Sequence, residues 1–393
     1  MTSRSHLDHS RRLHLVQSEE ALSDLLLALR GVQRVGVDTE ANSFHAYHER
    51  VCLIQISTEE ADWVVDPLAV HPEPLGSFFS DERTEVVFHA GEFDVLSLKR
   101  DFSFRFASIF DTQIAAMLLG MGQAGYASLV EQFFGVRLPK GQQRSDWGRR
   151  PLTSRQMDYA VADTRYLLPL RARLGAMLEE QGRLVEARAG FARLAASEPR
   201  PRVFDPEGYR KIKGFRDLDP TGRSIVRALY LARETRAKRL NKPPFRVLGN
   251  DAIMGIATLR PRDRTALSKV KGVPETTIQR FGDQLLEAVT RGLKDRTPPP
   301  LKRGGPRGSG GRSGKELGSV ATKRFERLRA WRNRMAAEKG IAGHMVLRNE
   351  VLRLIASESP RTIAELRGIL GKDDILVSSY GQGILDVLDE GAP

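Results

Sequence analysis

Cysteine is nearly absent from this sequence: Cys52 is the only one among 393 residues. A single cysteine excludes an internal disulfide framework and any cysteine-rich zinc module. Long apolar runs are also missing, because no stretch reaches the roughly 18 residues of a membrane span, and the richest early stretch, 21–29, is interrupted by Asp24. We therefore expect a soluble, cytoplasmic protein with neither a membrane span nor a secretory signal.

Charge is present in excess, but it is unevenly placed. Residues 1–200 carry 23 Lys and Arg against 27 Asp and Glu, a net of −4, whereas residues 201–393 carry 39 against 22, a net of +17. Basic surfaces often serve solubility alone, but solubility does not require opposite signs in the two halves. The split predicts that the basic half binds a polyanion and that the slightly acidic half has a different function. Nucleic acid is the leading class of partner.

Short apolar runs alternate with helical patterns in the first half. The predicted strands are rich in valine and isoleucine and bounded by polar residues: 34–39, 51–57, 62–66 and 85–89. Helical patterns lie at 20–29, 93–100, 112–119, 128–134 and 154–181, the last with Thr153 or Ser154 as its N-cap. Strands mixed with helices predict an α/β domain over one sheet, which we place at residues 1–200.

Only helical patterns follow residue 205, and they occur twice. Leu229, Arg233 and Ala237 are matched 99 residues later by Leu328, Arg332 and Ala336, so we predict two related all-α domains at 205–293 and 318–393. Between them, 294–317 has four prolines, six glycines and seven Lys or Arg, which predicts a flexible basic linker. The second copy is diverged: its net charge is +2, and Gly381 and Gly383 are expected to interrupt its last helical pattern, 374–388.

Three acidic fragments carry the candidate chemistry. Asp38 and Glu40 end a predicted strand two residues apart and share one face, where two repelling carboxylates favour a divalent cation. Asp94 opens a helix after a strand and a tight turn, while Tyr159 and Asp163 are i and i+4 neighbours on one helix. Each fragment alone also fits a plainer account: a solvated strand end, a carboxylate stabilised by a helix dipole, or a hydrogen-bonded Tyr–Asp pair.

Together and in this order, the fragments resemble the DEDD exonucleases of the tyrosine subtype. The string QRSDWGRRPL at 143–152, ahead of Tyr159, narrows the resemblance to the ribonuclease D family. The basic repeat at 219–291 resembles the helicase-and-RNase-D C-terminal (HRDC) domain, of which that family can carry two. The resemblance implies a ribonuclease H-like fold, an α/β domain with a mixed sheet flanked by helices, followed by two small all-α HRDC-like domains.

The resemblance also implies a reaction and its cofactors. Two divalent metal ions, Mg²⁺ or Mn²⁺, would be held by Asp38, Glu40, Asp94 and Asp163, with Tyr159 positioning the attacking water. The activity would be 3′→5′ hydrolysis of RNA with a free 3′ end, such as tRNA precursors, releasing nucleoside 5′-monophosphates. A DNA 3′→5′ exonuclease and a nucleic-acid-binding scaffold with an idle nuclease site remain as alternatives.

Candidate RNA contacts lie in both halves of the chain. Phe44, after the acidic strand end, either stacks on a terminal base or folds onto the domain, and His89 and Arg149 are candidates for substrate and phosphate contacts. Asp111, just before a helical pattern, is expected to be an N-cap. A basic cluster on the first repeat predicts phosphate contacts or a solvated helix face: Arg233, Arg236, Arg239 and Lys242.

Overall fold

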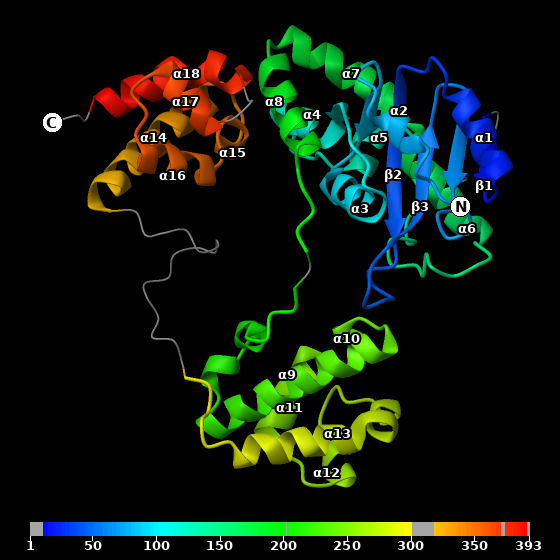
Figure 1. The fold of residues 1–393 in the computed structure, drawn as a ribbon, viewed down its shortest axis with the longest axis vertical. Coiled ribbons are helices and arrows are strands. Elements are labelled where there is room, and N and C mark those ends of the chain that lie inside the picture. Colours follow the sequence, from blue (N-terminus) through cyan, green and yellow to red (C-terminus); the bar gives the residue numbers. More distant parts are fainter. Residues whose placement is uncertain (1–10, 202, 301–317, 371–373, 391–393) are drawn as a thin grey trace. The chain divides into compact units, whose positions relative to one another are not determined.

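The computed structural model describes residues 11–201, 203–300, 318–370 and 374–390 (Figure 1). The chain divides into two compact units. One unit comprises Met1–Ala41, Val51–Pro199 and Ser313–Pro393, and the other comprises Asn42–Arg50 and Arg200–Arg312. The first unit therefore contains the sheet and the second repeat, and the other unit contains the first repeat and a short loop. Most of the predicted linker, 301–317, lies outside the described residues.

A six-stranded mixed sheet forms the centre of the first unit. Its strands lie in the order β1 (Arg12–Val16), β4 (Ala61–Val65), β3 (Val51–Ser57), β2 (Arg34–Ala41), β5 (Glu85–Phe88) and β6 (Ser108–Asp111). β3 runs antiparallel to β2 and β4, and the other neighbours are parallel. The α/β prediction is confirmed. The patterns missed β1, an edge strand that leaves Leu13 and Leu15 exposed, and the four-residue β6.

Helices cover this sheet. They are α1 (Glu19–Ala28), α2 (Leu75–Phe79), α3 (Glu92–Phe102), α4 (Thr112–Leu118), α5 (Tyr126–Phe134), α6 (Ser154–Arg165), α7 (Leu167–Glu180) and α8 (Leu184–Ala195). The single helix expected over 154–181 is wrong, because the chain breaks at Tyr166, whose N–H donates to the Tyr126 hydroxyl at 3.2 Å. The predicted N-cap of α6 is confirmed in a capping box between Thr153 and Gln156.

Close contact between α7 and β2 fixes the position of the α6–α7 pair on the sheet. A Cβ atom at Gly36 of β2 would stand 2.9 Å from Leu167 Cβ and 3.1 Å from the Thr164 carbonyl oxygen. Only glycine permits this approach. Gly36, Asp38 and Glu40 are two residues apart and therefore lie on the same face of β2. Both acids thus face the side of the sheet on which α6 packs.

The two repeats share one helical plan. The first consists of short 3-10 turns at Gly208–Lys211 and Phe215–Asp217, then α9 (Pro220–Leu240), α10 (Pro244–Val247), α11 (Asn250–Leu259), α12 (Arg264–Ser268) and α13 (Glu275–Lys294). The second consists of α14 (Ser319–Glu338), α15 (Gly343–Val346), α16 (Asn349–Glu358), α17 (Ile363–Leu370) and α18 (Asp374–Asp389). None of these helices, nor any other in the described part of the chain, is long and apolar enough to cross a bilayer.

The 99-residue offset reappears in side-chain contacts. Arg233 Nη1 donates to the Leu248 carbonyl at 3.0 Å and to Asn250 Oδ1 at 2.8 Å. Arg332 Nη1 donates to the Leu347 carbonyl at 3.1 Å and to Asn349 Oδ1 at 2.6 Å. Both arginines are 7% exposed, so each repeat uses a buried guanidinium to hold the turn after its first long helix.

The expectation that Gly381 and Gly383 interrupt the last helix is wrong, because α18 runs through both. A Cβ at Gly381 would stand 2.9 Å from Ile363 Cδ1, and one at Gly383 would stand 3.2 Å from Trp331 Nε1. The two glycines therefore let α18 approach its neighbours closely. This packing offsets the roughly 0.5–1 kcal/mol that each glycine costs inside a helix.

The second repeat packs against α8 within the first unit. Glu186 of α8 accepts hydrogen bonds from Lys339 and from the Tyr380 hydroxyl, the latter at 2.8 Å. Arg183 Nη2 donates to the Lys339 carbonyl at 2.6 Å. Apolar contact accompanies these bonds, because Ala189 joins the core of the repeat. The second repeat is thus attached to the sheet domain through a buried, charged contact.

Candidate active site

Three carboxylates meet at the end of β2. One oxygen each of Asp38, Glu40 and Asp163 lies within 4.8 Å of the others. β2 supplies the first two from one face, and α6 supplies the third because it packs across that face. Asp94, from the first turn of α3, lines the same pocket of about 530 Å³. The structure therefore brings together all four acids that the sequence singled out.

Hydrogen bonds attach Asp94 to β2. Its Oδ1 accepts from the backbone N–H of Thr39 at 3.1 Å and from the Thr39 hydroxyl at 2.5 Å. β5 pairs with β2 only as far as Gly36, so the carboxylate takes up a backbone N–H beyond the end of the neighbouring strand. Thr39 could not be recognised from the sequence, because a threonine between two acids carries no distinct signal.

A tight turn sets the direction of Asp94. Ala90 has a φ of 54°, and a Cβ at Gly91 would stand 2.5 Å from Phe88 Cβ, so glycine is required there. Asp111 fixes this turn, because its Oδ2 accepts from the Gly91 N–H at 2.8 Å. Its Oδ1 accepts from two N–H groups at the start of α4, which confirms the predicted N-cap.

Burial and mutual repulsion raise the pKa values of these acids. Burial, reinforced by neighbouring carboxylates, raises the pKa of Glu40 to about 9 and that of Asp163 to about 7. Burial raises the pKa of Asp94 to about 6 against the opposing hydrogen bonds from Thr39, and it raises the pKa of Asp38 well above its usual range. Four carboxylates lie together here, and their raised pKa values show that ionising them without a cation is unfavourable. Such a set of oxygen ligands fits a hard divalent cation such as Mg²⁺ or Mn²⁺.

Tyr159 lies one helical turn before Asp163, and both side chains line the acidic pocket. Burial and the surrounding carboxylates raise the pKa of Tyr159 above its usual range, so the phenol stays protonated. Its ring packs beside Trp147, the fully buried centre of the 143–152 string, at a centroid distance of 6.1 Å. Arg150 fixes the same string to the sheet through Asp66, with an Nη2–Oδ1 distance of 2.6 Å.

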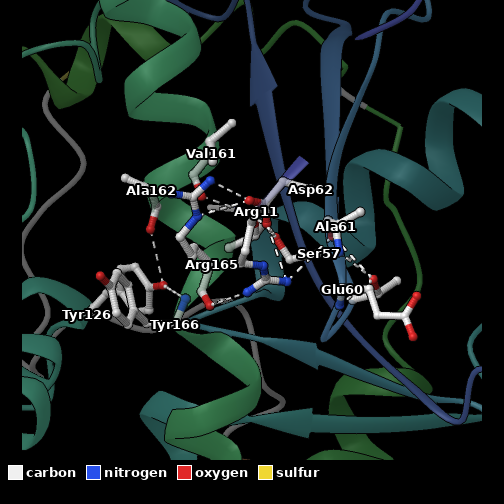
Figure 2. A network of polar contacts seen from close by, with 12 residues as sticks. Arg11, Ser57, Glu60, Ala61, Asp62, Tyr126, Val161, Ala162, Arg165 and Tyr166 are labelled. Carbon is white, nitrogen blue, oxygen red and sulfur yellow. Dashed lines mark hydrogen bonds and ion pairs between the residues drawn. The ribbon is translucent and has the colours of Figure 1, made fainter. Parts of the chain in front are cut away.

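A network of paired charges holds the end of α6 to the sheet (Figure 2). Arg165, two residues after Asp163, donates to Asp62 Oδ2 from Nε at 2.9 Å and from Nη2 at 2.5 Å. Both side chains are buried. The Ser57 hydroxyl lies 2.7 Å from Asp62 Oδ1 and 2.7 Å from Thr164 Oγ1. β3 and β4 therefore fix the turn of α6 that carries Asp163.

Tyr126 holds this turn from the opposite side. Its hydroxyl donates to the Ala162 carbonyl at 3.3 Å and accepts from the Tyr166 N–H at 3.2 Å, so it spans the backbone on both sides of Asp163 (Figure 2). It also lines the acidic pocket. No pattern in the sequence identified Tyr126, Asp62 or Arg165, because the partners are separated by 36 to 103 residues.

The predicted RNA contacts of the first half lie in different surroundings. His89 lines the acidic pocket, with Nδ1 2.8 Å from Thr112 Oγ1, and burial lowers its pKa to about 4, so its ring is neutral. Arg149 is exposed. Phe44 is 41% exposed and belongs to the other compact unit.

The predicted RNA contacts on the first repeat differ in how far they are exposed to solvent. Arg239 and Lys242 are exposed at the end of α9, and Arg236 is half-buried, with Nη2 3.2 Å from the Arg280 carbonyl. Arg233 is different, because it is buried and bonded to the turn after its helix. The buried guanidinium of Arg233 is therefore not available to a phosphate.

Comparison with known proteins identifies the class of protein that this fold and site define. Residues 13–179 match the family model of a 3′-5′ exonuclease, and residues 223–289 and 321–388 match the HRDC domain. The class is thus a 3′–5′ exonuclease domain followed by two HRDC domains.

The particular family follows from whole-chain relatives. The chain is 34% identical over 303 residues to the ribonuclease D of Gluconacetobacter diazotrophicus, covering 75% of this chain and 77% of that one. It is 31% identical over 386 residues to the ribonuclease D of Granulibacter bethesdensis, covering 93% and 92%. The crystal structure of Escherichia coli RNase D has the same fold, with a TM-score of 0.60 at 24% identity over 96% of this chain and 99% of that one. This chain belongs to the ribonuclease D family.

Proposed function

We propose that this protein shortens RNA from its free 3′ end by one nucleotide at a time, with tRNA precursors as its natural substrates. The products are nucleoside 5′-monophosphates, and the activity is cytoplasmic. The pocket that holds four carboxylates and a protonated tyrosine carries this proposal. The relatives named ribonuclease D favour RNA over DNA as the substrate.

The four acids are the proposed ligands of two divalent cations, Mg²⁺ or Mn²⁺. When bound, such a pair neutralises the charge on the attacking and leaving oxygens of an in-line displacement. Asp38 and Glu40 approach from the strand, Asp163 from α6, and Asp94 from α3, where Thr39 fixes its orientation. The raised pKa values mean that these carboxylates release protons when a cation binds.

Tyr159 is the proposed orienting group for the water that attacks the terminal phosphodiester. Its hydroxyl keeps its proton at neutral pH, so it acts as a hydrogen-bonding partner and not as a base. Trp147 packs beside the ring and restricts its position. As the water adds to phosphorus, the bond to the 3′ oxygen breaks, the 5′-monophosphate departs, and the shortened RNA ends in a new 3′ hydroxyl.

The first prediction concerns Asp38→Ala, compared with the wild type on matched RNA and DNA that carry 5′ labels and single-stranded 3′ tails. We expect a ladder of shortened RNA that requires Mg²⁺ or Mn²⁺ and vanishes with chelator. Asp38→Ala loses at least about 10³-fold in rate but keeps most of its RNA affinity, because a metal ligand and not a phosphate contact is removed.

Glu131→Gln is the matched control, because it removes an exposed carboxylate from α5, outside the pocket. We expect this variant to retain full activity. Shortening of DNA alone would reassign the substrate. Intact RNA in every reaction, with binding retained, would show that the pocket is idle.

A further inference from the structure

The loop 42–50, between β2 and β3, belongs to the same compact unit as the first repeat. Asn241 holds its backbone, because Oδ1 accepts from the N–H groups of Tyr47 and His48, each at 3.1 Å. The Tyr47 hydroxyl donates to Glu234, and its ring packs against the core of the repeat. The loop is therefore built into the surface of the first repeat.

Asn241 is suited to this position by its backbone. It caps the C-terminus of α9 in the left-handed conformation, with a φ of 46°, which asparagine adopts more readily than most residues. In this conformation its own N–H bonds back to the end of α9, while its side chain reaches the loop. One residue thus ends the helix and fixes the loop.

Two phenylalanines meet where the loop joins the repeat. Phe44 of the loop and Phe245 of α10 lie edge to face, with ring centroids 6.4 Å apart and planes at 74°. They are 41% and 55% exposed. Phenylalanine is usually buried, so two exposed rings in contact form an apolar surface that suits a stacking partner.

Cations lie next to this aromatic pair in the chain. Arg246 directly follows Phe245, is exposed, and has Nη2 3.4 Å from His45 Nε2 of the loop. Lys242 and Arg239 are exposed at the end of α9, just before α10. Aromatic rings beside exposed cations suit single-stranded nucleic acid, because bases stack on the rings and phosphates contact the cations.

We propose that Phe44 and Phe245, with Arg246, Lys242 and Arg239, form one platform that binds the RNA strand a few nucleotides upstream of its 3′ end. This proposal rests on the proposed function. Phe44 follows Glu40 by four residues, so the chain keeps their Cα atoms within about 14 Å of each other. Asn241 acts as a positioning residue that keeps the two rings adjacent.

The second prediction tests the platform by measuring the binding of the full-length protein, in chelator, to hairpin RNAs with 3′ tails of one to eight nucleotides. We expect Phe245→Ala to weaken binding of the eight-nucleotide tail by about tenfold and to leave the one-nucleotide tail unchanged, because only the long tail reaches a stacking ring. Asn241→Gly keeps the left-handed backbone and both rings but removes the acceptor, and we expect a similar loss.

Leu259→Ala is the matched control, because Leu259 is 60% exposed on α11 of the same repeat and should bind every tail as the wild type does. Unchanged binding by both Phe245→Ala and Asn241→Gly would overturn the platform, as would equal losses for long and short tails. Hydrolysis of a dinucleotide by the wild-type protein, a substrate too short for the platform, separates this outcome from failure of the proposed function. Leu259→Ala should cleave it at the wild-type rate.

Discussion

Two groups of buried charged residues lie on the last turns of α6. The acids of one group have no basic partner in the part of the chain that the structure describes, whereas the charges of the other are paired. Around Asp163, acids gather, and none of the ion pairs among the described residues involves Asp38, Glu40, Asp94 or Asp163. Around Arg165, two residues later, the buried Asp62 is paired with Arg165 and also with Arg11, at 3.6 Å (Figure 2). Folding alone favours paired charges, so the unpaired group marks the place where a ligand completes the balance.

The paired group gives the largest expected effect. Asp62→Asn leaves Arg165 buried without its carboxylate, and we expect the free energy of unfolding to fall by about 3–5 kcal/mol. Urea unfolding followed by tryptophan fluorescence measures this change. The double variant Asp62→Leu with Arg165→Met should recover part of the stability, since apolar replacement of a buried ion pair is often neutral but Arg11 still loses its partner. A loss below about 1 kcal/mol for Asp62→Asn would contradict the structural role of the pair.

The unpaired acids make the stability of the metal-free protein depend on pH. Glu40, with a folded pKa of about 9, binds its proton more tightly in the folded protein than in the unfolded chain, where its pKa is about 4.3. The contribution of this proton to stability is complete below about pH 4 and is lost as the pH rises through about 9. Asp94 and Asp163 add to the loss from about pH 4 upwards, until the pH passes their folded pKa values of about 6 and about 7.

We therefore expect the metal-free protein to lose on the order of 4 kcal/mol of stability between pH 6 and pH 8, and Mg²⁺ or Mn²⁺ to restore it. Thermal unfolding at several pH values, with chelator or with excess cation, measures both changes. Asp38→Asn removes one repelling carboxylate and should flatten the slope, whereas Glu131→Gln should not. Stability that rises with pH in chelator would contradict the repulsion between these acids.

The sequence predicted the acids well and their supports poorly. Asp38, Glu40, Tyr159 and Asp163 sit at local spacings of two and four residues, which the period of a strand or helix converts directly into shared faces. The pair of Asp62 and Arg165 spans 103 residues, so no local period reveals it. Helical order and strand content were predictable for the same reason, because both follow from local patterns.

Arg233 and Gly381 show why other details escaped prediction. A basic residue in an amphipathic pattern is usually exposed, but Arg233 turns inward because the carbonyl of Leu248 and the side chain of Asn250 provide acceptors there. Gly381 weakens a helix in isolation, yet α18 needs it in order to pass Ile363. Tertiary contacts decided both outcomes, and they are not visible in one segment of sequence.

Glu186, which contacts the second repeat, is also a paired acid, and its replacement is expected to change stability least. Burial raises its pKa, but the hydrogen bonds from Lys339 and Tyr380 outweigh burial and hold the pKa below its usual range, so Glu186 behaves as a paired acid. Its contribution to stability is present above about pH 4.5 and is lost as the pH falls through its folded pKa.

We expect Glu186→Gln to cost about 1–2 kcal/mol, less than Asp62→Asn, because Lys339 is 35% exposed and water can solvate its charge. Amide hydrogen exchange should quicken in α8, α15 and α18, where the repeat meets the sheet domain, while the salt dependence of RNA binding stays unchanged. This result would show that the ion pair of Glu186 and Lys339 holds the two domains together and does not contribute to RNA binding. A weaker salt dependence in Glu186→Gln would contradict this assignment and would give the second repeat a direct share in substrate binding.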